Sequence, residues 1–228
     1  MNSVPALWDG VGSADGARLL TPATLKESTE QMIRRALLNG DMRAGEIYSA
    51  NALARQLGIS NSPAREAMMT LVNKGLLELV RNRGFRVVEL SDTDKREIYE
   101  LRLQIEVEAV RRVAAAGVST SETEFLRAAA QRTVDLAQRD DMGDYLEADQ
   151  SFHAGLVGMN GNRRWTDIVE NLRDLSRVNG FYRFLATDHY LAESADEHLR
   201  IAAAVIAGDA ERAAELMVHH LEYARPRG

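Results

Sequence analysis

The sequence predicts a mainly α-helical protein in which an N-terminal winged helix-turn-helix precedes a six-helix antiparallel bundle. Residues 53–68 have the pattern of two short helices joined by a glycine-containing turn. Two β-prone runs around a polar turn follow directly, over residues 76–90, and predict a small β-hairpin. From residue 92 onward the pattern is helical, without strand-like alternation of polar and apolar residues.

The helix-turn-helix is predicted from helix start and stop signals. The first helix has an apolar stripe, and Gly58 can end it because glycine adopts the left-handed conformation without steric cost. Either Ser60 or Ser62 can cap the second helix, in which Pro63 falls in the first turn. Arg65 then lies near the exposed leading end of that helix, which is the end that enters a DNA major groove.

The same spacing would also fit an αα-hairpin inside a helical protein, but the following hairpin favours DNA binding. Residues 76–80 and 85–90 flank its turn, and a hairpin directly after a recognition helix is the wing of a winged helix. Arg81 and Arg83 at its tip suit contact with phosphates or the minor groove, and Gly84 lets the backbone approach closely.

Composition excludes several classes of protein. The chain has 228 residues with 45% hydrophobic and 27% charged content, which is ordinary for a globular protein. No apolar run approaches the roughly 20 residues that span a bilayer, and the N-terminus lacks the features of an export signal. The absence of cysteine excludes a disulfide scaffold and a thiolate zinc site. We therefore expect a cytoplasmic protein without a membrane partner.

Charge is distributed unevenly along the chain. The net charge of −6 divides into −1 over residues 1–23, +3 over residues 24–90 and −8 over residues 91–228. A basic segment beside an acidic remainder is typical of a protein in which only one part faces nucleic acid. Residues 1–23 are rich in glycine, alanine and serine and are expected to form a flexible arm.

The remaining helices are predicted from apolar periodicity and from breaks at Gly or Asn-Gly. A helix is expected from Thr24 to Gly40, and Ser91-Asp-Thr-Asp94 reads as both a linker and a helix cap. The six helices of the bundle are expected over residues 92–116, 120–139, 143–159, 163–187, 191–207 and 209–224.

Four polar residues share the apolar faces of three of these helices: Asp149, His153, His198 and His220. Burying a polar group without a partner costs on the order of 1–3 kcal/mol, and a shared divalent metal ion would remove that cost for all four. One carboxylate and three imidazoles suit zinc first, and also nickel, manganese or iron. The alternative is a set of separate hydrogen-bonded core histidines. His219 is expected to face away from the core, and His189 to be solvated.

Arg102 is a second charged residue on an inner face, with Glu106 one helical turn further on. An intrahelical ion pair between the two explains the pattern by itself. The alternative is a guanidinium that binds the carboxylate of a small ligand beside the metal.

Together these segments resemble the GntR superfamily of bacterial transcription regulators, and the bundle resembles its FadR-type ligand-sensing domain, closest to the shorter VanR-like subgroup. The resemblance covers about residues 24–224. The matching motifs are Gly40-Asp-Met-Arg-Ala-Gly-Glu46, residues 53–67, Gly75-Leu-Leu, Arg83-Gly84, Arg102 with Glu106, Asp149-x-x-Phe-His153, Gly161-Asn162, Glu197-His198, Gly208-Asp209 and His220.

The resemblance implies a homodimer that binds double-stranded operator DNA through residues 24–90. It implies that residues 91–228 bind an effector and form the dimer. In metal-containing members the ligands coincide with the Asp and three His residues above, and a small organic acid occupies open positions on the metal. A metal-dependent hydrolase is the alternative function, although the sequence offers no evident general base for it.

One departure from the family concerns the recognition helix. The family commonly has arginine after the serine that opens this helix, whereas this chain has Asn61. Asparagine can read adenine where arginine usually reads guanine, so we expect an altered operator preference. The residues expected to contact DNA are Asn61, Ser62, Arg65, Arg81, Arg83 and Gly84.

Overall fold

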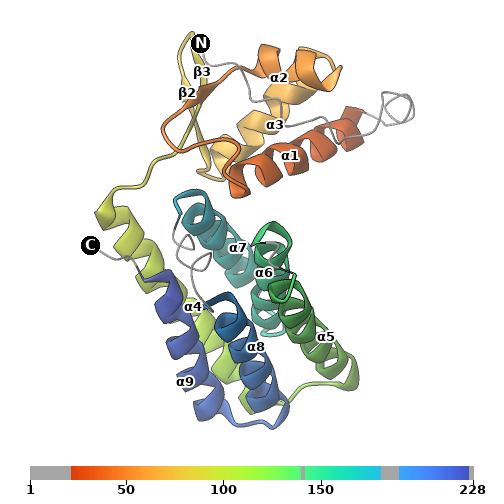
Figure 1. Cartoon of the computed structure of the whole chain (residues 1–228), viewed down its shortest axis with the longest axis vertical. Coiled ribbons are helices and arrows are strands. Elements are labelled where there is room, and N and C mark those ends of the chain that lie inside the picture. The colour runs from red at the N-terminus through yellow and green to blue at the C-terminus, as the bar shows by residue number, and fades with distance from the viewer. Residues whose placement is uncertain (1–21, 140–141, 181–189, 226–228) are drawn as a thin grey trace. The chain divides into compact units, whose positions relative to one another are not determined.

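Three helices and a small antiparallel sheet form the first of two units in the computed structural model, which describes residues 22–139, 142–180 and 190–225 (Figure 1). This unit ends at Glu89, and Leu90 begins the second. Its elements are α1 (Pro22–Leu38), β1 (Ile47–Tyr48), α2 (Ala50–Leu57), α3 (Asn61–Asn73), β2 (Leu77–Val80) and β3 (Gly84–Val87). The arm expected over residues 1–23 falls almost entirely outside the described residues.

Helices α2 and α3 form the expected helix-turn-helix. Gly58 ends α2 with φ of 65°, in the left-handed conformation that the turn requires. Of the two candidate caps, Ser60 occupies the N-cap position of α3 but makes no side-chain hydrogen bond there. The Ser62 hydroxyl instead donates to Glu66 Oε1, 2.8 Å away on the next turn. Pro63 lies in the first turn, where a backbone N–H has no helical partner.

The wing is a three-stranded sheet with the order β1-β3-β2, and all pairs are antiparallel. The hairpin of β2 and β3 agrees with the sequence, whereas no strand was predicted where β1 lies. A two-residue strand shows no periodicity, so only its pairing with β3 defines it. Gly84 lies so close to this strand that a Cβ atom would be 2.4 Å from the Tyr48 carbonyl oxygen. The absent side chain therefore allows β1 and β3 to pair.

The second unit is a bundle of six long helices (Figure 1). They are α4 (Asp92–Ala116), α5 (Thr120–Ala137), α6 (Met142–Gly158), α7 (Arg163–Val178), α8 (Tyr190–Ile206) and α9 (Ala210–Leu221), followed by the short 3-10 helix η3 (Glu222–Ala224). Capping boxes at Ser91 and Ser119 fix the starts of α4 and α5. The helix expected over residues 163–187 ends at Val178, because Asn179 and Gly180, whose φ is 75°, leave the helical conformation.

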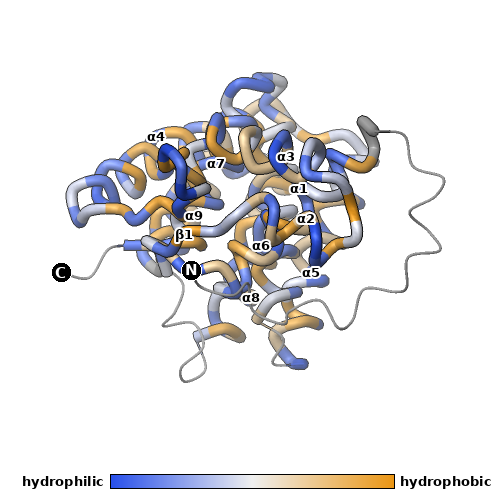
Figure 2. The backbone as a smooth tube through the Cα atoms, turned by 90° about the horizontal axis from the view of Figure 1, so that it is seen from above, coloured by the Kyte–Doolittle hydropathy of each residue, from blue (hydrophilic) through white to orange (hydrophobic). Residues whose placement is uncertain are grey.

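Each helix of the bundle presents one hydrophobic face to a shared core. Figure 2 shows hydrophobic and hydrophilic residues alternating along these helices, as in amphipathic helices. The core contains large side chains from α5, α6 and α8, such as Leu126, Tyr145, Phe152 and Ile201, each fully buried. Among the described residues, no helix has the length and apolar character needed to cross a membrane.

A candidate metal centre inside the bundle

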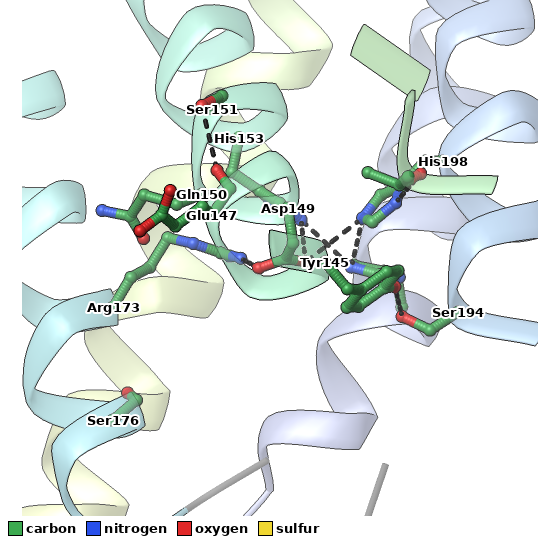
Figure 3. A network of polar contacts seen from close by, with 12 residues as sticks. Tyr145, Glu147, Asp149, Gln150, Ser151, His153, Arg173, Ser176, Ser194 and His198 are labelled. Atoms are coloured by element: carbon green, nitrogen blue, oxygen red, sulfur yellow. Dashed lines mark hydrogen bonds and ion pairs between the residues drawn. The ribbon is translucent and has the colours of Figure 1, made fainter. Parts of the chain in front are cut away.

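Four side chains from three helices meet inside the bundle. Asp149 and His153 come from α6, His198 from α8 and His220 from α9. None is more than 5% exposed, and one potential ligand atom of each lies within 4.8 Å of those of the other three. Figure 3 shows the Asp149, His153 and His198 side chains directed toward one another. The structure therefore brings together the complete set expected from the sequence.

The atoms that converge are the Nε2 atoms of the three imidazoles. His220 Nε2 lies 3.0 Å from His153 Nε2 and 3.2 Å from His198 Nε2. Asp149 Oδ1 lies 3.4 Å from His198 Nε2 and 3.7 Å from His153 Nε2. Three nitrogens and one oxygen thus surround a single point.

Contacts at the opposite ring nitrogens determine where the protons of two imidazoles lie. The Thr133 hydroxyl donates to the Ala130 carbonyl at 2.7 Å, so it accepts from His198 Nδ1, 3.0 Å away. His220 Nδ1 lies 2.9 Å from Glu197 Oε2, and a carboxylate can only accept. Both rings therefore carry a proton on Nδ1 and direct Nε2 into the centre.

The third imidazole has an acidic partner as well. His153 Nδ1 lies 2.6 Å from Glu106 Oε2, although at an angle that is poor for a hydrogen bond. Burial, together with the charge of Arg173, lowers the pKa of His153 to about 3. Burial and the neighbouring His220 lower the pKa of His198 to about 4. These two imidazoles are therefore neutral at pH 7, which is the form that binds metal ions.

This donor set fits a divalent cation. His220 Nε2 lies 3.0 and 3.2 Å from the other two Nε2 atoms, and a cation at their centre could be coordinated by all three. The carboxylate and imidazole donors suit zinc, nickel, manganese or iron. Carboxylates and a hydroxyl on the Nδ1 side match the outer partners that metal-binding histidines usually have. Separate hydrogen-bonded histidines do not account for three Nε2 atoms facing one another.

A buried guanidinium that was not expected from the sequence lies beside these four side chains. Arg173 on α7 is 2% exposed and contacts Asp149 Oδ2, as Figure 3 shows, and its other terminal nitrogen lies 3.2 Å from Glu106 Oε2. Arg173 follows the apolar Val169 by four residues, so it shares a helix face with an apolar residue, as Arg102 does. This spacing could have identified Arg173 from the sequence. The Asp149 carboxylate is therefore shared between the cluster and a fixed positive charge.

Arg102 forms the intrahelical pair expected from its spacing, with Nε 2.8 Å from Glu106 Oε1. Glu106 thus contacts two guanidinium groups and one imidazole while being fully buried. Burial alone would raise the pKa of Glu106, but Arg102 and Arg173 outweigh it and hold the pKa well below its usual range. Burial likewise opposes ionisation of Asp149, and Arg173 again keeps its pKa well below normal. Both carboxylates are therefore charged.

His219 is largely exposed but does not simply face solvent. Its Nδ1 lies 2.7 Å from Glu197 Oε1, so one carboxylate holds His219 and His220 together. His219 was expected to face away from the core, and this contact was not predicted because it depends on the packing of α8 against α9. The prediction for His189 lies outside the described residues.

A second candidate site occupies the surface of the first unit. The hollow has a volume of about 1070 Å³, and the recognition helix α3 and the wing line it. Its polar lining residues are Glu46, Ser49, Asn51, Asn61, Arg65, Arg81, Asn82 and Arg83. Arg65 is exposed, with its guanidinium carbon 5.9 Å from the centre of the Phe85 ring.

This arrangement includes most of the residues predicted to contact DNA. Asn61, Arg65, Arg81, Arg83 and Gly84 line the hollow. Ser62 does not, and its hydroxyl is occupied by the contact within α3 described above. Asn51 and Asn82 were not expected there. Asn82 has φ of 59°, a conformation that asparagine tolerates at a tight turn.

Comparison with known families identifies both units. Residues 25–87 match the gntR family of bacterial regulatory proteins, and residues 97–223 match the FCD domain. The chain belongs to the GntR family of transcription regulators, in the branch with an FCD ligand-binding domain. The predicted order of a winged helix-turn-helix and a helical bundle is thus confirmed.

Similar proteins support this assignment over most of the chain. The HTH-type transcriptional regulator YdhC of Bacillus subtilis is 28% identical over 84% of this chain and 85% of its own. The HTH-type transcriptional repressor GlaR of Escherichia coli is 28% identical over 83% of this chain and 89% of its own. The solved structure of Escherichia coli McbR/YncC has the same fold, with a TM-score of 0.76, 21% identity and coverage of 87% and 93%.

The same comparisons decide between regulator and enzyme. These relatives are named as transcription regulators, and the FCD domain accompanies the gntR domain here. The GntR-family protein is therefore a DNA-binding transcription regulator and not an enzyme. The hydrolase alternative is not supported.

Proposed function

We propose that this GntR-family regulator holds a divalent metal ion between Asp149, His153, His198 and His220, and that a small organic acid bound at this ion controls its affinity for operator DNA. The convergence of three imidazole Nε2 atoms on one point carries the proposal. Zinc is the first candidate, and nickel, manganese and iron suit the same ligands. The ion supplies a Lewis-acidic position at which a carboxylate can bind.

Two guanidinium groups favour an anionic effector. Arg102 and Arg173 meet at Glu106 and lie within the same buried network as the metal ligands. Arginine binds carboxylates through paired N–H groups, so a ligand carboxylate near the metal can replace part of the contact with Glu106. A ligand that contacts both the metal and these arginines binds with a different affinity to each arrangement of the network. Only such differential binding can shift a regulator between two states.

DNA binding is proposed for the α3 and wing surface. Asn61, Ser62 and Arg65 would read bases or phosphates from the recognition helix, while Arg81, Arg83 and Gly84 would follow the neighbouring backbone or minor groove. We propose that residues 91–228 form a homodimer, so that two winged helices bind a roughly palindromic operator. The +3 charge of residues 24–90 is consistent with this assignment.

Elemental analysis of the purified protein tests the metal centre. Wild-type protein is expected to contain about one metal ion per chain, and the double variant Asp149→Ala with His153→Ala none. Thermal-shift screening of small organic acids against metal-loaded protein then finds the effector. Titration of an operator with and without that acid measures the coupling, for which ~5–150-fold is typical. A change in operator affinity below ~2-fold with the best acid would contradict the proposal.

A further inference from the structure

Helix α7 runs antiparallel to α4, and contacts at several levels align the two helices. The pairs are Arg112 with Trp165, Ala109 with Val169, Glu106 with Arg173 and Leu90 with Asn179. The first pair lies at the end remote from the linker, and the third lies in the buried network. The last pair involves Leu90, which precedes α4 and begins the sensing unit.

Asn179 holds the chain at the point where it leaves the DNA-binding unit. Its Oδ1 accepts a hydrogen bond from the Leu90 backbone N–H at 2.9 Å, and its Nδ2 donates to the Leu175 carbonyl at 3.0 Å. The Leu90 side chain packs against the core of the bundle. The linker is therefore tied to the C-terminal end of α7.

The same helix carries Arg173, six residues before Asn179. An α-helix rises 1.5 Å per residue, so the two residues lie about 9 Å apart along the axis. A hydrogen-bonded helix moves as a unit, and packed helices shift by roughly 1–2 Å in switching proteins. A carboxylate that draws Arg173 away from Asp149 or Glu106 would thus displace the end of α7 that holds Leu90.

We infer that Asn179 is a positioning residue that couples the Arg173 contacts of the sensing site to the linker. The inference rests on the proposed function, because it explains how occupancy of the metal centre reaches the winged helix. A helix-capping role alone needs only the bond from Nδ2 to Leu175. The bond from Leu90 to Oδ1 has no part in capping and joins two segments 89 residues apart in the sequence.

Hydrogen exchange of the Leu90 amide tests the coupling in the full-length, zinc-loaded protein. Asn179→Ala is expected to speed this exchange roughly 10-fold, since it removes the acceptor. Asn179→Asp retains an acceptor oxygen and loses only the Nδ2 donor, so its exchange rate stays near that of wild type. Asn171→Ala is the matched control on α7, because Asn171 Oδ1 has no hydrogen-bond partner among the described residues.

A second variant connects the linker to the buried network. Arg173→Lys keeps the charge but removes the pair of terminal nitrogens that contact Glu106 and Asp149 separately. We expect it to speed hydrogen exchange of the Leu90 amide severalfold. The double variant Arg173→Lys with Asn179→Ala should exchange no faster than Asn179→Ala alone. A Leu90 exchange rate equal to that of wild type in Asn179→Ala or in Arg173→Lys would overturn the inference. Additive effects on this rate in the double variant would also overturn it.

Operator binding separates this inference from the proposed function. The probe is zinc alone, and the measured quantity is the ratio of operator Kd values in zinc and in chelator. Asn179→Ala should move this ratio toward 1 while its zinc affinity stays at the wild-type value. A ratio equal to that of wild type would overturn the inference. A wild-type protein that binds no operator would instead contradict the proposed function, and the exchange experiment, which needs no DNA, would still decide on the coupling.

Discussion

The two oxygens of Asp149 have different partners: Oδ2 contacts the Arg173 guanidinium, and Oδ1 lies 3.4 Å from His198 Nε2. The arginine thus fixes the carboxylate orientation that leaves one oxygen for a metal ion. It also keeps the carboxylate ionised inside a buried site, where burial by itself would raise its pKa.

Replacing this arginine should therefore weaken metal binding. We expect Arg173→Gln to lower metal affinity about 10–100-fold, as is usual for groups that orient a metal ligand. Competition with a chelating dye measures the affinity. Arg177→Gln on the same helix is the control, because Arg177 donates a hydrogen bond to the Gly143 carbonyl. Equal affinities in the two variants would show that Arg173 does not orient the ligand.

Glu197 should matter through His220. Glu197→Gln replaces a carboxylate acceptor by an amide, so the Nδ1 proton of His220 is held less firmly and the ring is oriented less well. A loss of roughly 10-fold in metal affinity is expected, measured by calorimetry. Glu193→Gln, an exposed position one turn earlier on α8, should bind metal as wild type does. Equal metal affinities in Glu197→Gln and Glu193→Gln would show that the Glu197 carboxylate does not support His220.

Removal of the metal should destabilise the protein. A cation bound only by the folded protein stabilises it, so a chelator is expected to lower the unfolding midpoint of the wild type. A stabilisation of about 2.7 kcal/mol corresponds to a free metal concentration 100-fold above Kd. Thermal unfolding measures the shift. The double variant Asp149→Ala with His153→Ala should show none, and an equal shift in this variant would place the chelator effect elsewhere.

Gly84→Ala should damage the wing. Its φ of 128° disfavours any residue with a side chain, and the new Cβ would meet the Tyr48 carbonyl. We expect a loss of about 1–3 kcal/mol in the stability of the DNA-binding unit, together with weaker operator binding. Gly75→Ala is the control, since Gly75 also has positive φ but open space around it, and should cost only about 1 kcal/mol. Chemical denaturation compares the two variants.

Asn61→Arg should change the operator sequence that the protein selects. Arginine at this exposed position can bind guanine through two hydrogen bonds, whereas asparagine pairs with adenine. Selection from a random DNA library should show the change at one position of each half-site. Asn73→Arg, at the far end of α3, supplies the same charge without reaching the bases. An unchanged consensus in Asn61→Arg would mean that Asn61 makes no base contact.

The wing arginines should contribute through charge. Arg81→Ala and Arg83→Ala are each expected to reduce the slope of log affinity against log salt by about 0.9, the value for one lost phosphate contact. Fluorescence anisotropy across salt concentrations measures these slopes. Arg86→Ala is the control, because Glu78, 2.6 Å away, already balances the Arg86 charge. If the slope of either variant stays at the wild-type value, the replaced arginine makes no contact with a DNA phosphate.

The candidate metal ligands could be predicted because an α-helix places residues four apart on the same face. Asp149 and His153 satisfy this spacing, and His198 and His220 each share a stripe with large apolar residues. The ends of elements were harder to predict. Helix α7 ends at Val178 although the apolar pattern continues, because helix ends depend on local conformations such as that of Gly180.

The order of the elements, the helix-turn-helix, the basic first unit and the inward-facing polar residues could all be predicted from the sequence, because they follow from composition, periodicity and local backbone preferences. The convergence of the imidazoles of α6, α8 and α9 on one point depends on how these helices pack. Only packing brought Arg173 to Asp149, β1 to Gly84 and Asn179 to Leu90. Contacts between distant segments depend on how helices and strands pack, and no local pattern encodes that geometry.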